Sequence, residues 1–168
     1  MTAITQLQMS YSAEEDRILL RLNTSAEEEF RFWITRRFAL ILQQALQAHR
    51  QADPDVAIQP TPDAQQAVQE FKQQAAQSRG NFKEEFKPSA KLPLGDAPLL
   101  AFKLSYRIEG GKLHLSLQPK TGRGISLVLD SQLNFNVTRL LRSASEAGKW
   151  GLDWGGTADL VPEKRVIN

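Results

Sequence analysis

The chain of 168 residues contains no cysteine and only two histidines, His49 and His114. Without cysteine it can form neither disulfides nor thiolate metal sites. Two histidines are too few for a catalytic zinc site with three histidine ligands. We therefore expect no metal and no cofactor.

Long apolar runs are missing as well. No stretch of 18 apolar residues occurs, so we expect no transmembrane helix. Residues 1–10 are polar and lack the basic and apolar segments of a signal peptide, so we expect a cytoplasmic protein without a membrane partner. The net charge of +2 is too small to indicate nucleic-acid binding on its own.

The sequence also lacks the motifs of common enzymes. It has no P-loop, dinucleotide fingerprint, nucleophile elbow or metalloprotease helix. Gly122-Arg123-Gly124 falls in a predicted hairpin turn and does not precede a helix, so we do not interpret it as a phosphate loop. The acidic clusters at 14–16 and 27–29 lie at opposite ends of one predicted strand, about 25 Å apart. The two clusters therefore cannot form one metal site. Because no catalytic motif is found, we expect a protein that is not an enzyme.

What the sequence does contain is an internal repeat. Residues 7–49 recur as residues 102–144, at a constant offset of 95 and without a gap. Few residues are identical, but in both copies the apolar spacing changes from a period of 2 to one of 3.6. Each copy therefore predicts antiparallel strands followed by one helix.

The first copy predicts strands over 6–12, 17–23 and 29–34, then a helix from an N-cap at Thr35 to about Arg50. The second copy predicts strands over 100–108, 113–117 and 125–129. Its helix runs from an N-cap at Asp130 to a C′ glycine at Gly148. Gly110-Gly111 is typical of a two-residue hairpin turn between the first two of these strands.

The remaining segments lie between and after the copies. We divide a single domain, 1–168, into repeat 1 (4–50), a linker with a peripheral helix (51–98), repeat 2 (99–147) and a tail (148–168). The peripheral helix is predicted from Pro62 to Gly80, with a thin apolar stripe that includes Phe71. Trp150 and Trp154 are expected to pack the tail onto the body.

One repeat of this length would bury too little surface to fold alone, so two repeats should share a core. The predicted class is α+β: a duplicated β-β-β-α unit forming a pseudo-twofold antiparallel sheet of about six strands, with the helices on one face. The alternative is two separate sheets joined by the glutamine-rich helix. The order of elements is similar to that of the PUR-repeat and Whirly class of single-stranded nucleic-acid binders, which have four strands per unit.

The outward-facing positions of the predicted strands are rich in cations, and Glu29 is the only acid among them. A basic sheet face with an aromatic side chain can hold single-stranded nucleic acid, because cations follow the phosphates and a ring stacks on a base. The candidate nucleic-acid-binding residues are Arg17, Arg21, Arg31, Trp33, Lys103, Arg107, Lys112 and His114.

The first functional hypothesis is therefore a non-catalytic binding protein for single-stranded DNA or RNA. The alternative is a homodimeric or protein-interaction module that uses the same face through Leu19, Trp33 and Val128. A small-molecule enzyme with a pocket near His114 is the third hypothesis, although no nucleophile or orienting carboxylate accompanies this residue. His49 is interpreted as a partly buried residue at a helix end.

Overall fold

A computed structural model describes residues 3–79 and 86–154 of the chain, which form two sheets and four helices. The first sheet has the order β1-β2-β3-β4: β1 (Ile4–Ser12), β2 (Arg17–Thr24), β3 (Glu29–Ile34) and β4 (Leu99–Leu100). The second has the order β5-β6-β7: β5 (Lys103–Glu109), β6 (Lys112–Gln118) and β7 (Ile125–Leu129). The helices are α1 (Arg36–Gln51), α2 (Pro54–Ala57), α3 (Pro62–Arg79) and α4 (Ser131–Ala147).

The α+β class is confirmed, but the prediction of one sheet of about six strands is wrong. The predicted strand over 100–108 is divided between the two sheets: β4 pairs with β3 in parallel, and β5 pairs with β6. The chain crosses between the sheets at residues 101–102, where Ala101 N–H donates to Trp33 O and Phe102 N–H donates to Gln118 O. This short crossing, and not the glutamine-rich helix, joins the two sheets.

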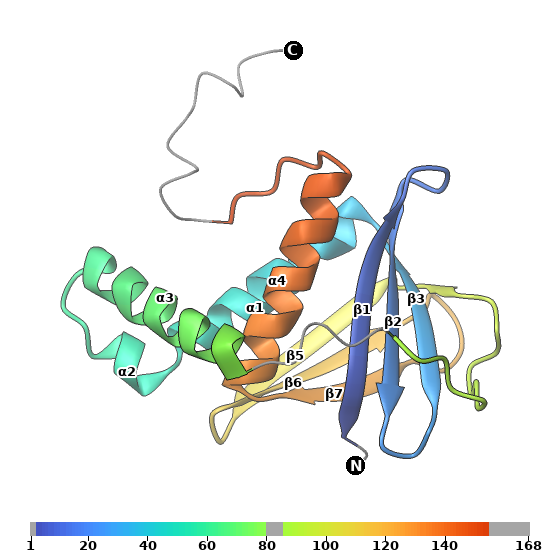
Figure 1. Ribbon diagram of the computed structural model, residues 1–168, viewed down its shortest axis with the longest axis horizontal. Helices are drawn as coiled ribbons and strands as arrows, with labels where there is room; N and C mark the ends of the chain where they lie inside the picture. The colour runs from blue at the N-terminus through green and yellow to red at the C-terminus, as the bar shows by residue number, and fades with distance from the viewer. Residues whose placement is uncertain (1–2, 80–85, 155–168) are drawn as a thin grey trace.

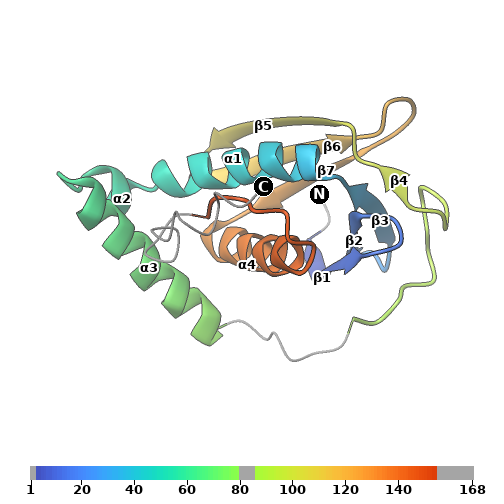
Figure 2. The same ribbon diagram turned by 90° about the horizontal axis from the view of Figure 1, so that it is seen from above.

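The two halves of the chain exchange their helices. Helix α1, from the first half, packs against β5 and β6 of the second sheet, whereas α4 packs mainly against β1 of the first sheet (Figures 1 and 2). The two helices also contact each other, and a single cluster of buried side chains includes residues from both sheets and both helices. Neither half therefore has a complete core of its own, which agrees with the expectation that they share one.

Both predicted N-caps are confirmed. The Thr35 hydroxyl accepts from Phe38 N–H at 3.2 Å, and the Asp130 carboxylate accepts from Leu133 N–H at 2.8 Å. The helices that they begin start at residues 36 and 131, which keeps the offset of 95. The order β-β-β-α occurs in each half, while the duplication of one ancestral unit stays a prediction.

The end of α4 differs from the prediction. Gly148 is the C-cap and has an ordinary φ of −81°, whereas Lys149 occupies the left-handed region at φ 55°. Lys149 N–H donates to Glu146 O and Trp150 N–H donates to Ser145 O, the pair of bonds of a Schellman motif. The glycine is needed for packing instead, because a Cβ at position 148 would lie 2.6 Å from Cε1 of Tyr11.

The start of the tail packs onto the body as predicted. Trp150 is buried and meets the Tyr11 ring edge-on, with 6.0 Å between the ring centroids, and the half-buried Trp154 packs against the core. Residues 155–168 of the predicted tail lie outside the described residues, as does Gly80, at which the peripheral helix is predicted to end.

Helix α3 lies at the periphery, against α2 and α4 (Figure 2). The predicted apolar stripe is wrong at Phe71, which is 72% exposed. Polar contacts hold the helix instead: Lys72 Nζ lies 2.6 Å from the carboxylate of Asp53 and 2.8 Å from that of Asp55.

Candidate functional site

The eight candidate nucleic-acid-binding residues do not share one sheet. Arg17, Arg21, Arg31 and Trp33 belong to the first sheet, whereas the other four, Lys103, Arg107, Lys112 and His114, belong to the second. The two groups therefore have different surroundings.

On the first sheet, Glu29 forms ion pairs with two of the candidate arginines. Its carboxylate is fully buried and accepts hydrogen bonds from Arg21 at 3.2 Å, from Arg31, and from Ser89 N–H at 3.1 Å. Burial alone would raise the pKa of Glu29, but the bonds from Arg31 and Ser89 and the charge of Arg21 outweigh it. The pKa of Glu29 therefore lies below its ordinary value, and the carboxylate is ionised at neutral pH.

The segment 86–98 covers this part of the first sheet. The Phe86 ring lies against the Arg21 guanidinium, 4.4 Å from Cζ to the ring centroid, and Arg31 donates to Asp96 O at 2.9 Å. The segment also bonds to Asn23, whose side chain donates to Lys87 O. Arg21 and Arg31 thus hold a connecting segment in place, and their side chains are only about one-quarter exposed.

On the second sheet the outward-facing side chains form rows across the three strands. Arg107, His114 and Val128 are neighbours in one row, and Ser105, Ser116 and Ser126 in the next. The two rows line a shallow depression of about 280 Å³. Arg107 forms an exposed ion pair with Glu109 at 3.0 Å, while Lys103 and Lys112 form none with any residue in 3–79 or 86–154.

A larger cleft of about 740 Å³ adjoins this depression, and His114, Ser126 and Val128 line both. It lies where the first sheet meets β7, and its apolar side chains include Leu22, Phe30 and Leu127. Lys112, His114 and Arg123 supply basic groups, whereas the acid that lines it, Asp130, caps α4. The cleft therefore combines an apolar surface with an excess of cations.

Thr24 adds a polar group to the same cleft. Its residue is 8% exposed, and its hydroxyl has no hydrogen-bond partner among the described residues. Buried hydroxyls usually have a partner, so this group has capacity for a water or a ligand.

Phe30 and Arg123 were not among the sequence candidates. Phe30 has the apolar parity of its strand, which predicts a core position, but it is only half-buried because it lies where the two sheets separate. Arg123 was assigned to an ordinary turn, and the spacing of apolar residues contains no information on which surface a turn residue will meet.

His49 lies in a buried hydrogen-bond network between α1 and α4. Its Nδ1 accepts from Asn134 Nδ2 at 2.7 Å, so its Nε2 carries the proton and donates to Gly111 O at 2.9 Å. Arg50 donates to Asn134 and Thr138, and burial lowers the pKa of Arg50 to about 10, which leaves it charged at neutral pH. This network supports the expectation that His49 is structural.

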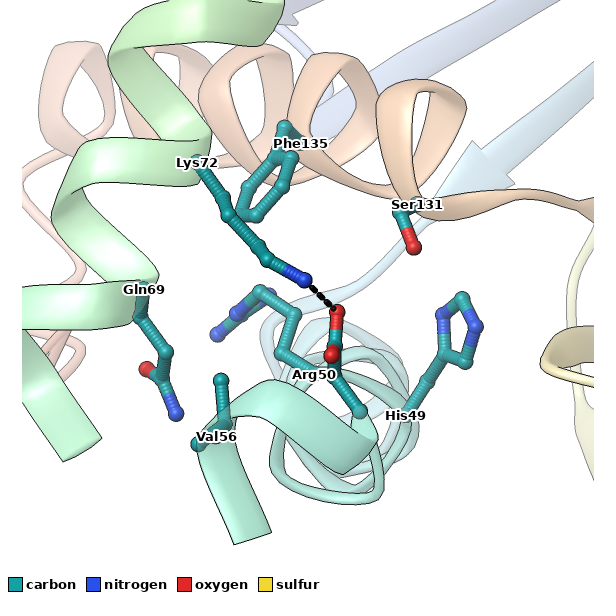
Figure 3. A pocket seen from close by; sticks show the side chains of 8 residues that line it. His49, Arg50, Val56, Gln69, Lys72, Ser131 and Phe135 are labelled. Atoms are coloured by element: carbon teal, nitrogen blue, oxygen red, sulfur yellow. Dashed lines mark hydrogen bonds and ion pairs between the residues drawn. The ribbon is translucent and has the colours of Figure 1, made fainter. Parts of the chain in front are cut away.

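The adjacent cavity is too small for a ligand. Figure 3 shows the Lys72–Asp53 ion pair crossing it, with His49, Arg50 and Phe135 around it. Its volume of about 10 Å³ suffices for one water molecule.

Within residues 3–79 and 86–154, no cluster of acidic or histidine side chains could hold a metal ion, and no helix is long and apolar enough to cross a membrane. Comparison of the chain with protein-family models, curated proteins and solved structures finds no match. A function can therefore be inferred only from the geometry of the site.

Proposed function

We propose that this is a non-catalytic binding protein that takes single-stranded nucleic acid in the cleft beside β7 and on the adjoining outer face of the second sheet. The observation that carries this proposal is the placement of Lys112, His114 and Arg123 around an apolar surface that includes Phe30.

The chemistry of this cleft suits a nucleotide chain. Phosphates are held by dispersed cations, and a base can stack on an aromatic ring such as Phe30. The volume of the cleft lies within the range of about 300–1,000 Å³ for small-molecule sites, so a nucleotide-sized unit fits. The serine hydroxyls of the depression can bond to phosphate or sugar oxygens, which favours recognition with little sequence preference.

Fluorescence anisotropy with labelled single-stranded DNA and RNA tests this function. We expect binding that weakens as salt rises, and a Kd about tenfold higher at low salt for Lys112→Ala combined with Arg123→Ala. The matched control is Arg142→Ala combined with Lys149→Ala, which removes the same charge from the end of α4. No binding at low salt, or an equal loss for both double variants, would contradict the proposal.

A protein-interaction module is the second candidate. The face predicted for it is divided, because Val128 lies in the second sheet and Trp33 in the first. However, Leu19, Trp33 and Leu100 are neighbours across β2, β3 and β4, and Leu100 is 40% exposed. If Trp33→Ser abolished capture of a partner protein while nucleic-acid binding was absent, this candidate would replace the first.

We also propose that the two β-β-β-α halves descend from one duplicated unit in a cytoplasmic protein. The constant offset of the two N-caps and the reciprocal packing of the helices support a common origin. An alignment of homologous chains in which the two halves show no residual similarity would count against it.

A further inference from the structure

Strand β5 forms one edge of the second sheet. No strand within residues 3–79 or 86–154 pairs with the other side of β5 (Figure 2). Its apolar side chains are poorly covered, with Tyr106 47% and Ile108 38% exposed. An exposed strand edge with apolar side chains is a template for pairing with another strand.

The hairpin determines which backbone groups the edge presents. Gly110 and Gly111 have φ of 60° and 76°, which makes the two-residue turn that closes on a hydrogen-bonded pair, Glu109 with Lys112. Hydrogen-bonded and non-hydrogen-bonded pairs alternate along an antiparallel ladder. The N–H and C=O groups of Leu104, Tyr106 and Ile108 therefore point away from β6, toward this edge of the sheet.

We propose that two copies of this chain pair through β5 in an antiparallel arrangement, with the twofold axis at Tyr106. Leu104 then faces Ile108 of the second copy on the apolar side of the sheet, and both offer outward backbone groups. On the other side, Lys103 faces Glu109 and Ser105 faces Arg107. The strand is thus complementary to itself in charge as well as in apolar character.

Charge also selects this register over its neighbours. In any alternative register, the outward backbone groups of the two copies meet only if it differs from the register centred on Tyr106 by an even number of residues. A shift of two in one direction places Lys103 opposite Arg107, and a shift of two in the other places Arg107 opposite Arg107. Both bring like charges directly opposite each other, which is destabilising.

The dimer would have one continuous sheet of six strands that crosses the twofold axis. Pairing would cover Tyr106 and Ile108, which are exposed in the single chain. This inference does not depend on the proposed nucleic-acid binding, because the strand pairing needs only β5 of two copies and is measured as a mass. Light scattering of the full chain during size-exclusion chromatography should give a mass that rises with concentration to twice the 18.9 kDa of one chain.

Two single charge reversals test the register. Lys103→Glu and Glu109→Lys each place like charges opposite one another twice in the homodimer, and we expect each to raise the dimer dissociation constant about tenfold or more. Mixing the two variants restores opposite charges at both contacts, so the mixture should form heterodimers about as tight as the wild-type dimer. The control is Lys149→Glu, a reversal of an exposed charge just after α4 that should leave the dissociation constant unchanged.

Hydrogen exchange provides an independent readout. The amides of Leu104, Tyr106 and Ile108 should exchange slowly in the dimer and fast in Lys103→Glu, while circular dichroism confirms that the variant is folded. A wild-type chain that is monomeric at every concentration would overturn the proposal. So would a dimer whose dissociation constant is insensitive to both reversals, or variants that fail to restore pairing when mixed.

Discussion

The outer faces of the two sheets have the same sequence pattern but different surroundings. In both, cations alternate with apolar residues along the strands. On the first sheet, the buried carboxylate of Glu29 binds Arg21 and Arg31, and the segment 86–98 covers them. On the second, the equivalent face is open and its acid, Glu109, forms only an exposed pair. The alternation of side chains along a strand therefore indicates which face of the sheet a residue lies on. It does not indicate whether that face is exposed to solvent.

The largest expected effect is the loss of the Glu29 carboxylate. Glu29→Gln leaves two partly buried guanidinium groups without a charge partner, and we expect the free energy of unfolding to fall by about 2–3 kcal/mol. Glu109→Gln breaks an exposed pair on the other sheet and should cost less than about 0.5 kcal/mol. Urea denaturation measures both. Equal effects would show that the two faces do not differ in this way.

The second expected effect is a pH dependence of stability that comes from Glu29 in the first sheet. Because folding lowers the pKa of Glu29 below its ordinary value of 4.5, its stabilisation is fully present above pH 4.5 and is lost as pH falls through the folded-state pKa. The difference in unfolding free energy between wild type and Glu29→Gln should therefore be largest near neutral pH and shrink in acid. Denaturation at several pH values tests this, and a constant difference down to pH 3 would contradict it.

The smallest expected effect compares one cation from each sheet. If the cleft binds nucleic acid, Lys112→Ala should raise the Kd for a single-stranded oligonucleotide about threefold, because one phosphate contact is lost. Arg17→Ala removes a cation from the first sheet and should leave the Kd unchanged. Anisotropy titrations at one low salt concentration make the comparison. A larger increase in Kd for Arg17→Ala than for Lys112→Ala would indicate that the binding site lies on the first sheet.

Local features of the fold could be predicted because they depend on short-range chemistry. Alternating apolar residues predicted the strands of both halves, and the side chains of Thr35 and Asp130 predicted where α1 and α4 begin. The prediction was wrong at Gly148, where the nearby ring of Tyr11 and not the backbone conformation requires a glycine. That requirement comes from a residue far away in the sequence.

The candidate site was predicted only in part. The spacing of residues placed Lys112 and His114 on an outward face, and both line the cleft. Arg123 and Phe30 could not be found in this way. Arg123 lies in a turn and Phe30 has the spacing of a core residue, and only the placement of the two sheets relative to each other brings them to the cleft. For the same reason, spacing along β2 and β3 could not reveal that the segment 86–98 returns to cover Arg21.

Periodicity and capping chemistry in the chain were enough to specify strands, helices and the need for a common core. The assembly of those elements settled three further matters: the division into two sheets, the exchange of α1 and α4, and the side of the molecule on which cations stay accessible. The physical reason is the range of the interactions involved. Periodicity and caps act over a few residues, whereas burial of Glu29 and formation of the cleft require contacts between segments 60 or more residues apart.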